Sequence, residues 1–133
     1  MTPAKTGESP ACAITRLNIT IEQKLDFAFS YQEEDKLLTL RSLLGLVRRL
    51  IHIRENFDSH DLDVLRIPLR REEKCVGASL KEIDRESIQG RSYTLESHER
   101  TGRSLVVIKG ASREDIDSLI ESCLGYVKKK LAE

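Results

Sequence analysis

The last forty residues constrain the fold of this chain more than any other segment. Residues 93–97 alternate large and polar side chains, which is typical of a half-buried strand. A polar loop follows at 98–103, and then a short apolar, β-branched run at 105–108. Beyond it, apolar residues recur every three or four positions, which predicts a helix that opens at Ser112. Two strands followed by a helix predict a domain that mixes sheet and helix.

A second strong pattern lies between residues 33 and 57, where there is no proline and one glycine. Its apolar residues fall into two adjacent helical stripes, so we expect a central helix that is contacted on more than one side. If the chain is an interaction subunit, we expect the helix to have more apolar surface than its own sheet can cover, and one of these stripes to meet another chain. The first stripe is Leu37, Leu40, Leu44, Val47 and Ile51, and the second is Leu43, Leu46, Leu50, Ile53 and Phe57.

The remaining segments have weaker patterns. Residues 17–22 alternate as a half-buried strand. Residues 25–31 allow two interpretations: a second strand after a turn near residues 23–24, which strict alternation favours, or the first turns of a helix. Pro68 limits the run at 64–69 to an edge strand, because proline cannot donate to a central ladder. Ser79 and Glu82 have the spacing of a capping box, which predicts a short helix from 80 to 88.

Together these patterns predict an α+β fold, in which a small, mainly antiparallel sheet packs against a long central helix and a C-terminal helix. We expect residues 1–12 to form a disordered tail and residues 13–133 to form one α+β domain. The tail has no apolar stretch of the kind found in signal peptides, and no run in the chain approaches membrane-spanning length. We therefore expect a cytoplasmic, intracellular protein that has no membrane partner.

Charge and cysteine content narrow the classes of function. The 22 basic and 22 acidic residues balance, which opposes bulk binding of nucleic acid or of a membrane surface but leaves room for a local patch. The three cysteines, Cys12, Cys75 and Cys123, lack metal-ligand spacing, so we expect reduced thiols. We also expect Cys123, on the apolar stripe of the last helix, to react slowly.

No strong catalytic or cofactor motif is present in the sequence, so we expect no cofactor, no catalytic residue and no enzyme activity. His60, Asp61 and Asp63 resemble a fragment of a metal site, and His52 lies nearby in the sequence. A hydrolytic metal site needs three or more convergent ligands, whereas acidic residues are also ordinary at helix ends. We therefore predict no metal site.

The candidate binding residues are basic. Residues 36–57 carry five basic residues and one acidic residue, and the loop at 98–104 adds two arginines. These side chains fit phosphates or an acidic protein surface. The alternative is a solvated helix face whose arginines pair with Asp58, Asp61 or Glu72, and the balanced overall charge favours this alternative. The candidates are Arg41, Arg48, Arg49, His52, Arg100 and Arg103.

Three hypotheses of function follow, in this order. The first is a non-catalytic protein-interaction module or assembly subunit that self-associates or belongs to a complex. The second is a small RNA-binding module that uses Arg48, Arg49, Arg100 and Arg103. The third is an enzyme whose site is assembled from isolated residues such as His52, His60 and Asp61.

Overall fold

The computed structural model describes residues 8–56, 64–69, 73, 75–86, 93–98, 103–109 and 113–133. The elements follow the chain in this order: α1 (Pro10–Leu25), α2 (Tyr31–Glu55), β1 (Val64–Pro68), α3 (Val76–Glu86), β2 (Tyr93–His98), β3 (Arg103–Lys109) and α4 (Arg113–Ala132).

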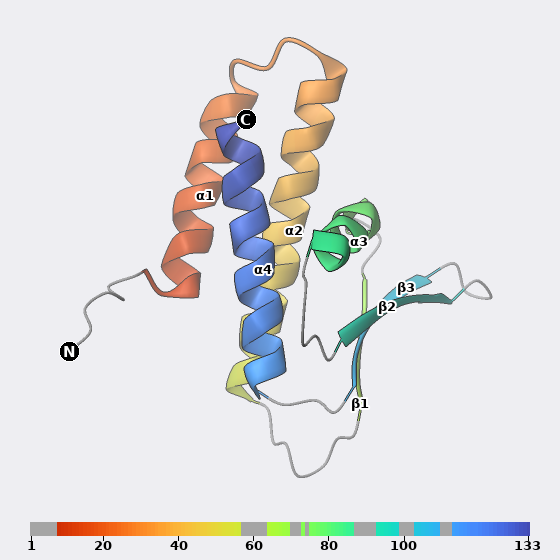
Figure 1. Cartoon of the computed structure of the whole chain (residues 1–133). Coiled ribbons are helices and arrows are strands. Elements are labelled where there is room, and N and C mark those ends of the chain that lie inside the picture. Colours follow the sequence, from red (N-terminus) through yellow and green to blue (C-terminus); the bar gives the residue numbers. More distant parts are fainter. Residues whose placement is uncertain are drawn as a thin grey trace.

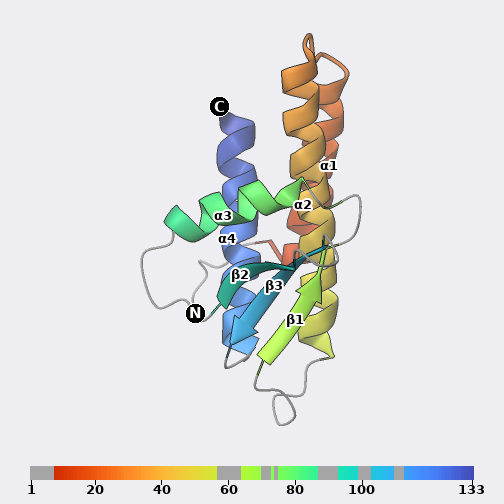
Figure 2. The same cartoon turned by 90° about the vertical axis from the view of Figure 1, so that its right-hand side faces the viewer.

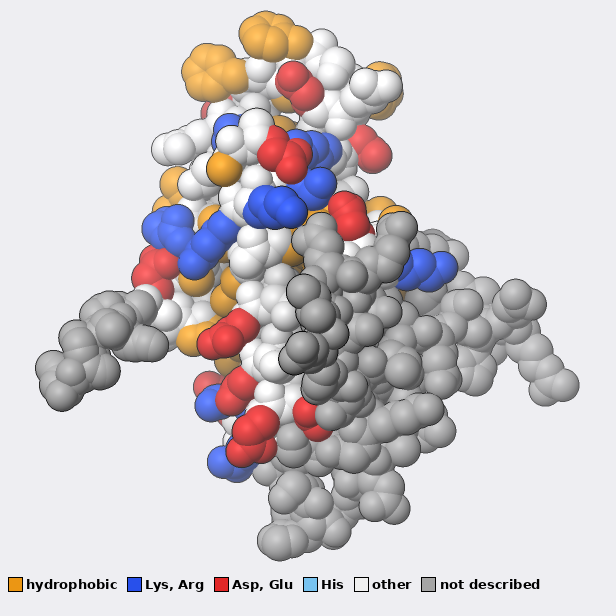
Figure 3. All heavy atoms as spheres, in the orientation of Figure 1, with side chains coloured by type: hydrophobic (Ala, Val, Ile, Leu, Met, Phe, Trp, Pro, Cys, Tyr) orange, Lys and Arg blue, Asp and Glu red, His pale blue; other side chains and the backbone are white. Residues whose placement is uncertain are grey.

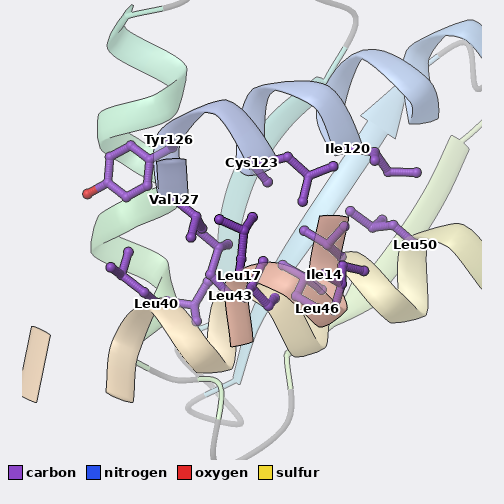
Figure 4. Packing of buried hydrophobic residues seen from close by; sticks show 14 of the residues in the cluster. Ile14, Leu17, Leu40, Leu43, Leu46, Leu50, Ile120, Cys123, Tyr126 and Val127 are labelled. Atoms are coloured by element: carbon purple, nitrogen blue, oxygen red, sulfur yellow. The ribbon is translucent and has the colours of Figure 1, made fainter. Parts of the chain in front are cut away.

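Three long helices, α1, α2 and α4, lie side by side as a bundle (Figure 1). Lys36, near the start of α2, forms an ion pair with Glu133 after the end of α4, with 3.3 Å between Nζ and Oε1. Arg54, near the end of α2, pairs with Asp117 in the first turns of α4. Helices α2 and α4 are therefore antiparallel. Figure 4 shows the aliphatic side chains that fill the space between the three helices.

A small sheet and α3 lie at one side of this bundle (Figures 1 and 2). The three strands pair antiparallel in the order β1-β3-β2. Ile67 of β1 and Leu69 just after it are buried in the same core cluster as the bundle helices. Helix α3 is tied to α4 by the Tyr126 hydroxyl, which donates to Glu82 Oε2 at 3.1 Å. The sheet and α3 therefore extend the core that the helices build.

The predicted α+β fold class is wrong, because the structure is mostly helical. The helices have 16, 25, 11 and 20 residues, whereas the strands have 5, 6 and 7. In the predicted fold, two helices pack against a sheet. In the structure, helices pack on helices, and the short strands flank them.

The largest error concerns α1, which occupies the segment that the sequence pattern assigned to a strand. The Ser9 side chain caps this helix by accepting a hydrogen bond from the Cys12 backbone N–H at 3.2 Å. Pro10 follows in the first turn, where a missing N–H costs nothing. The helix therefore begins inside the predicted tail of residues 1–12. Its buried residues recur at helical spacing and are Ala13, Ile14, Leu17 and Ile21.

Several local predictions agree with the structure. Helix α2 spans nearly the predicted residues, β1 is an edge strand, and β2, β3 and α4 lie where the pattern placed them. Helix α3 begins at Val76, before the predicted start, so Ser79 is buried within the helix and does not cap it. Leu80 and Ile83 are buried as expected.

Both apolar stripes of α2 are covered within the chain. Leu37, Leu40, Leu44 and Val47 of the first stripe and Leu43, Leu46 and Leu50 of the second are buried. Ile51 and Ile53 are half-buried, and Phe57 lies outside the described residues. The expectation that one stripe meets another chain is wrong, because α1 and α4 provide the partners that a sheet alone lacks.

Candidate docking site at the end of the α1–α2 hairpin

The structure divides the predicted basic residues into different roles. Arg41, Arg48 and His52 are exposed on α2, and no side-chain partner is found for them within the described part of the chain. Arg49 is held by an ion pair with the buried Glu73, and its Nη2 donates to the Pro68 carbonyl at 2.8 Å. Arg49 therefore ties α2 to the segment after β1, which is the structural role that the sequence favoured, although its partner is Glu73.

The hollow beside these residues has a volume of about 600 Å³. Gly45 lies within it, where a larger side chain of α2 would otherwise stand. Because Glu73 neutralises Arg49, the positive charge on this part of α2 comes from Arg48 and Arg41. Of the loop candidates, Arg103 begins β3 opposite His98 of β2, and Arg100 lies outside the described residues.

Among the residues that the structure describes, the other chemical candidates form no site. His60, Asp61 and Asp63 lie outside the described residues. In the part of the chain that is described, no group of three or more His, Cys, Asp or Glu side chains is placed to hold a metal ion. Cys123 is fully buried, and burial raises the pKa of its thiol to about 12, so it is a poor nucleophile. Cys12 and Cys75 are exposed.

Among the described residues, the most exposed large hydrophobic side chains lie at the end of the α1–α2 hairpin, which sequence analysis did not identify as a site. Phe27 is 73% exposed, Phe29 89% and Tyr31 87%, and we call these three residues the aromatic tip. Figure 3 shows hydrophobic side chains at this end of the molecule, with acidic side chains close by. Among the aromatic residues whose side chains are described, only Tyr126 is buried.

Two caps fix the backbone of the aromatic tip. The Ser30 hydroxyl accepts a hydrogen bond from the Glu33 N–H at 3.1 Å and so begins α2. The Glu33 carboxylate accepts one from the Phe29 N–H at 3.0 Å. Ala28 turns inward and packs against the core. The hairpin end is therefore a capped turn that holds its rings in water.

Four acidic residues accompany the rings, and we call them the acidic collar: Asp26, Glu33, Glu34 and Asp35, all exposed. Residues 26–35 contain no basic residue. Within the described residues, the side chains of Asp26, Glu34 and Asp35 have no hydrogen-bond or ion-pair partner. The basic residue that follows, Lys36, is paired with Glu133. The collar is therefore a local negative patch on a chain of zero net charge.

A hollow of about 700 Å³ lies beside the aromatic tip, among the last turns of α1, the first turns of α2 and the last turn of α4. Phe27, Leu37 and Leu131 give it apolar walls. Its charged lining residues are Lys24, Lys36, Lys130, Glu33 and Glu133. The hollow adjoins both features, because Phe27 of the aromatic tip and Glu33 of the acidic collar belong to its lining.

The sequence contains a signal for this site that the alternation of large residues at 25–31 concealed. Ser30 and Glu33 have the capping-box spacing, which places a helix start directly after Phe29. A helix start at that point makes residues 26–30 a turn. Phe27 and Phe29 would then be turn residues with no sheet to cover them.

The fold and this surface define a mostly helical protein whose exposed aromatic tip is available for contact. In comparisons with known proteins, no family model, no curated protein and no solved structure matches the chain. Over the residues that are described, none of the helices is both long enough and apolar enough to cross a membrane.

Proposed function

We propose that this protein is a non-catalytic protein-interaction module or a subunit of an assembly, and that the aromatic tip is its docking surface. The observation that carries the proposal is the exposure of Phe27, Phe29 and Tyr31. A chain with three Phe and three Tyr places half of them, uncovered, on one turn.

The area involved supports this proposal. A large aromatic side chain buries on the order of 200 Å², so the three rings expose roughly 500 Å² between them. This summed area is comparable with the largest apolar patch on a typical monomeric protein, and patches of that size often serve a function. A standard interface takes about 800 Å² from each partner, so the three rings alone would supply more than half of that area.

The capped turn also supports it. Interface hot spots are enriched in aromatic residues that are held rigidly before binding, because less conformational entropy is then lost on association. The hydrogen bonds of Ser30 and Glu33 fix the backbone that carries Phe29 and Tyr31, so less backbone ordering remains to be done on binding.

RNA binding is the second candidate, and the observation that favours it is the exposure of Arg41, Arg48 and His52 on one helix. The ion pair of Arg49 with Glu73 weakens the RNA-binding candidate, because Arg49 is then not available to a phosphate. The two candidates differ in salt dependence. An apolar contact survives high salt, whereas contacts with phosphates release counterions and weaken steeply.

The test combines sedimentation with site-specific crosslinking. The wild-type chain and a variant with Phe27→Ser, Phe29→Ser and Tyr31→Ser are sedimented alone and with mixed RNA, at low and high salt. In parallel, a photoreactive amino acid replaces Phe29 in cells, with the exposed Glu121 on α4 as the matched control position.

We expect discrete protein adducts from position 29 and none from position 121. If the wild-type chain self-associates, the triple variant should not. A strict monomer that shifts only with RNA, only at low salt, and gives no adduct from position 29 would refute the proposal in favour of RNA binding.

A further inference from the structure

We infer that the aromatic tip binds a basic amphipathic segment of a partner protein, in which large apolar side chains are flanked by lysine or arginine. This inference rests on the proposed function and adds the chemistry of the partner. It comes from the combination of the exposed rings with the acidic collar.

The rings require apolar contact. Phe29 and Tyr31 are almost fully in water, so a partner gains affinity only by covering them. The hollow next to Phe27 has apolar walls at Leu37 and Leu131, and it accepts side chains that extend beyond the rings. An amphipathic segment presents several such side chains along one face.

The acidic collar selects the charge of the partner. Asp26, Glu34 and Asp35 have no partner within the described residues, so their carboxylates are available to ammonium or guanidinium groups. Cations are also attracted to the faces of aromatic rings, which makes the tip doubly favourable for lysine and arginine. A partner that places its basic residues beside its apolar face meets both features at once.

The same charges disfavour other occupants. RNA phosphates and anionic lipid headgroups would approach four carboxylates in residues 26–35, which contain no basic side chain. Lys24, Lys36 and Lys130 line the adjacent hollow, where Lys36 and Lys130 are both paired with Glu133. Like charges brought together across an interface oppose binding. The acidic collar therefore gives the aromatic tip the opposite charge to the basic face of α2, which is the surface that the RNA hypothesis uses.

The experiment is a selection from a phage-displayed library of random 16-residue peptides on the wild-type protein. Binders that also bind the triple Ser variant of the aromatic tip are removed. The surviving sequences are synthesised with a fluorescent label and measured against single variants at low and high salt. Glu34→Lys reverses a charge of the collar, and Glu121→Lys makes the same change at a distant exposed position of α4.

We expect the surviving peptides to be enriched in lysine or arginine together with large apolar residues. Phe29→Ser should weaken their binding at least about tenfold at either salt concentration. Glu34→Lys should weaken it severalfold at low salt and less at high salt, because salt screens exposed charges. Glu121→Lys should leave it unchanged.

The outcomes separate the two proposals. Peptides that depend on the aromatic tip but carry no excess of basic residues would overturn the basic partner and leave the docking surface in place. A selection that yields no tip-dependent peptide would overturn both. Survivors that match a basic stretch of this chain itself would support the basic chemistry and identify a second copy as its source.

Discussion

Ile19 and Ile21 distinguish the helix that we observe from the strand that the sequence pattern favours. In a strand, residues two apart lie on the same face, so both side chains would be equally buried. In α1 they lie on different faces: Ile21 is 0% exposed and Ile19 is 53% exposed. Replacing each by alanine in separate variants therefore tests the architecture at a single segment.

The two costs follow from burial. Ile21→Ala removes a fully buried side chain and leaves a cavity between the helices, which costs about 2–5 kcal/mol. For a chain of 133 residues, a loss of about 3 kcal/mol lowers the Tm by roughly 10 °C. Ile19→Ala loses part of a half-exposed contact and gains a few tenths of a kcal/mol in helix propensity, so its net cost is under about 1 kcal/mol.

The assay is unfolding in urea followed by circular dichroism at 222 nm, with thermal melts as a second measurement. The midpoint should fall strongly for Ile21→Ala and barely for Ile19→Ala, with the slope of the transition unchanged in both. Leu17→Ala serves as a further positive control, because Leu17 is buried on the same helix. Equal destabilisation by the variants at positions 19 and 21 would refute the helical assignment of α1.

Further predictions concern the aromatic tip, the reactivity of the thiols, the folding stability at alkaline pH and the ion pair of Arg49 with Glu73. Phe29→Ser should change the free energy of unfolding by less than about 0.5 kcal/mol, since the ring is in water, and a large loss in a urea titration would contradict its exposure. Under native conditions Cys123 should react with a thiol reagent far more slowly than Cys12 and Cys75, and the difference should vanish in urea. Because burial raises the folded-state pKa of Cys123 to about 12 and also raises that of Tyr126, the unfolded chain loses these protons first, so stability should fall as the pH rises above about 9. The slope from Cys123 is at most about 1.4 kcal/mol per pH unit, and Cys123→Ala should flatten the curve whereas Cys12→Ala should not. Arg49→Ala should cost about 1–3 kcal/mol, because it removes a partner of the buried Glu73, and the matched Arg48→Ala should be nearly neutral in the same titration.

The elements that the sequence predicted well are those with long, regular patterns. Helix α2 has apolar residues around most of its circumference, and α4 adds acidic residues at its start and lysines at its end. The edge position of β1 followed from Pro68. These features are local, so a single sequence is sufficient to find them.

The fold class was missed because α1 satisfies two periodicities at once. Leu17, Ile19 and Ile21 alternate, but Ile14, Leu17 and Ile21 also recur at helical spacing, and tertiary contact with α2 and α4 decides between them. The exposure of the aromatic tip was missed for a related reason: alternating large residues indicate burial in a strand only when a neighbouring strand covers them. The basic candidates were chosen by their charge. The partner of Arg49 could not be predicted in this way, because the fold of the chain brings Glu73 beside Arg49 from 24 residues away.

The length of α2 has a further consequence for experiments on this protein. Its 25 residues span roughly 37 Å, and the aromatic tip precedes its first turn, whereas the ion pair of Arg54 with Asp117 lies near its last turn. Changes at sites so far apart, with no shared partner, add in free energy. A variant of the aromatic tip combined with Arg54→Ala should therefore change the free energy of unfolding by the sum of the two single changes. The two ends of the bundle can then be altered independently in one chain.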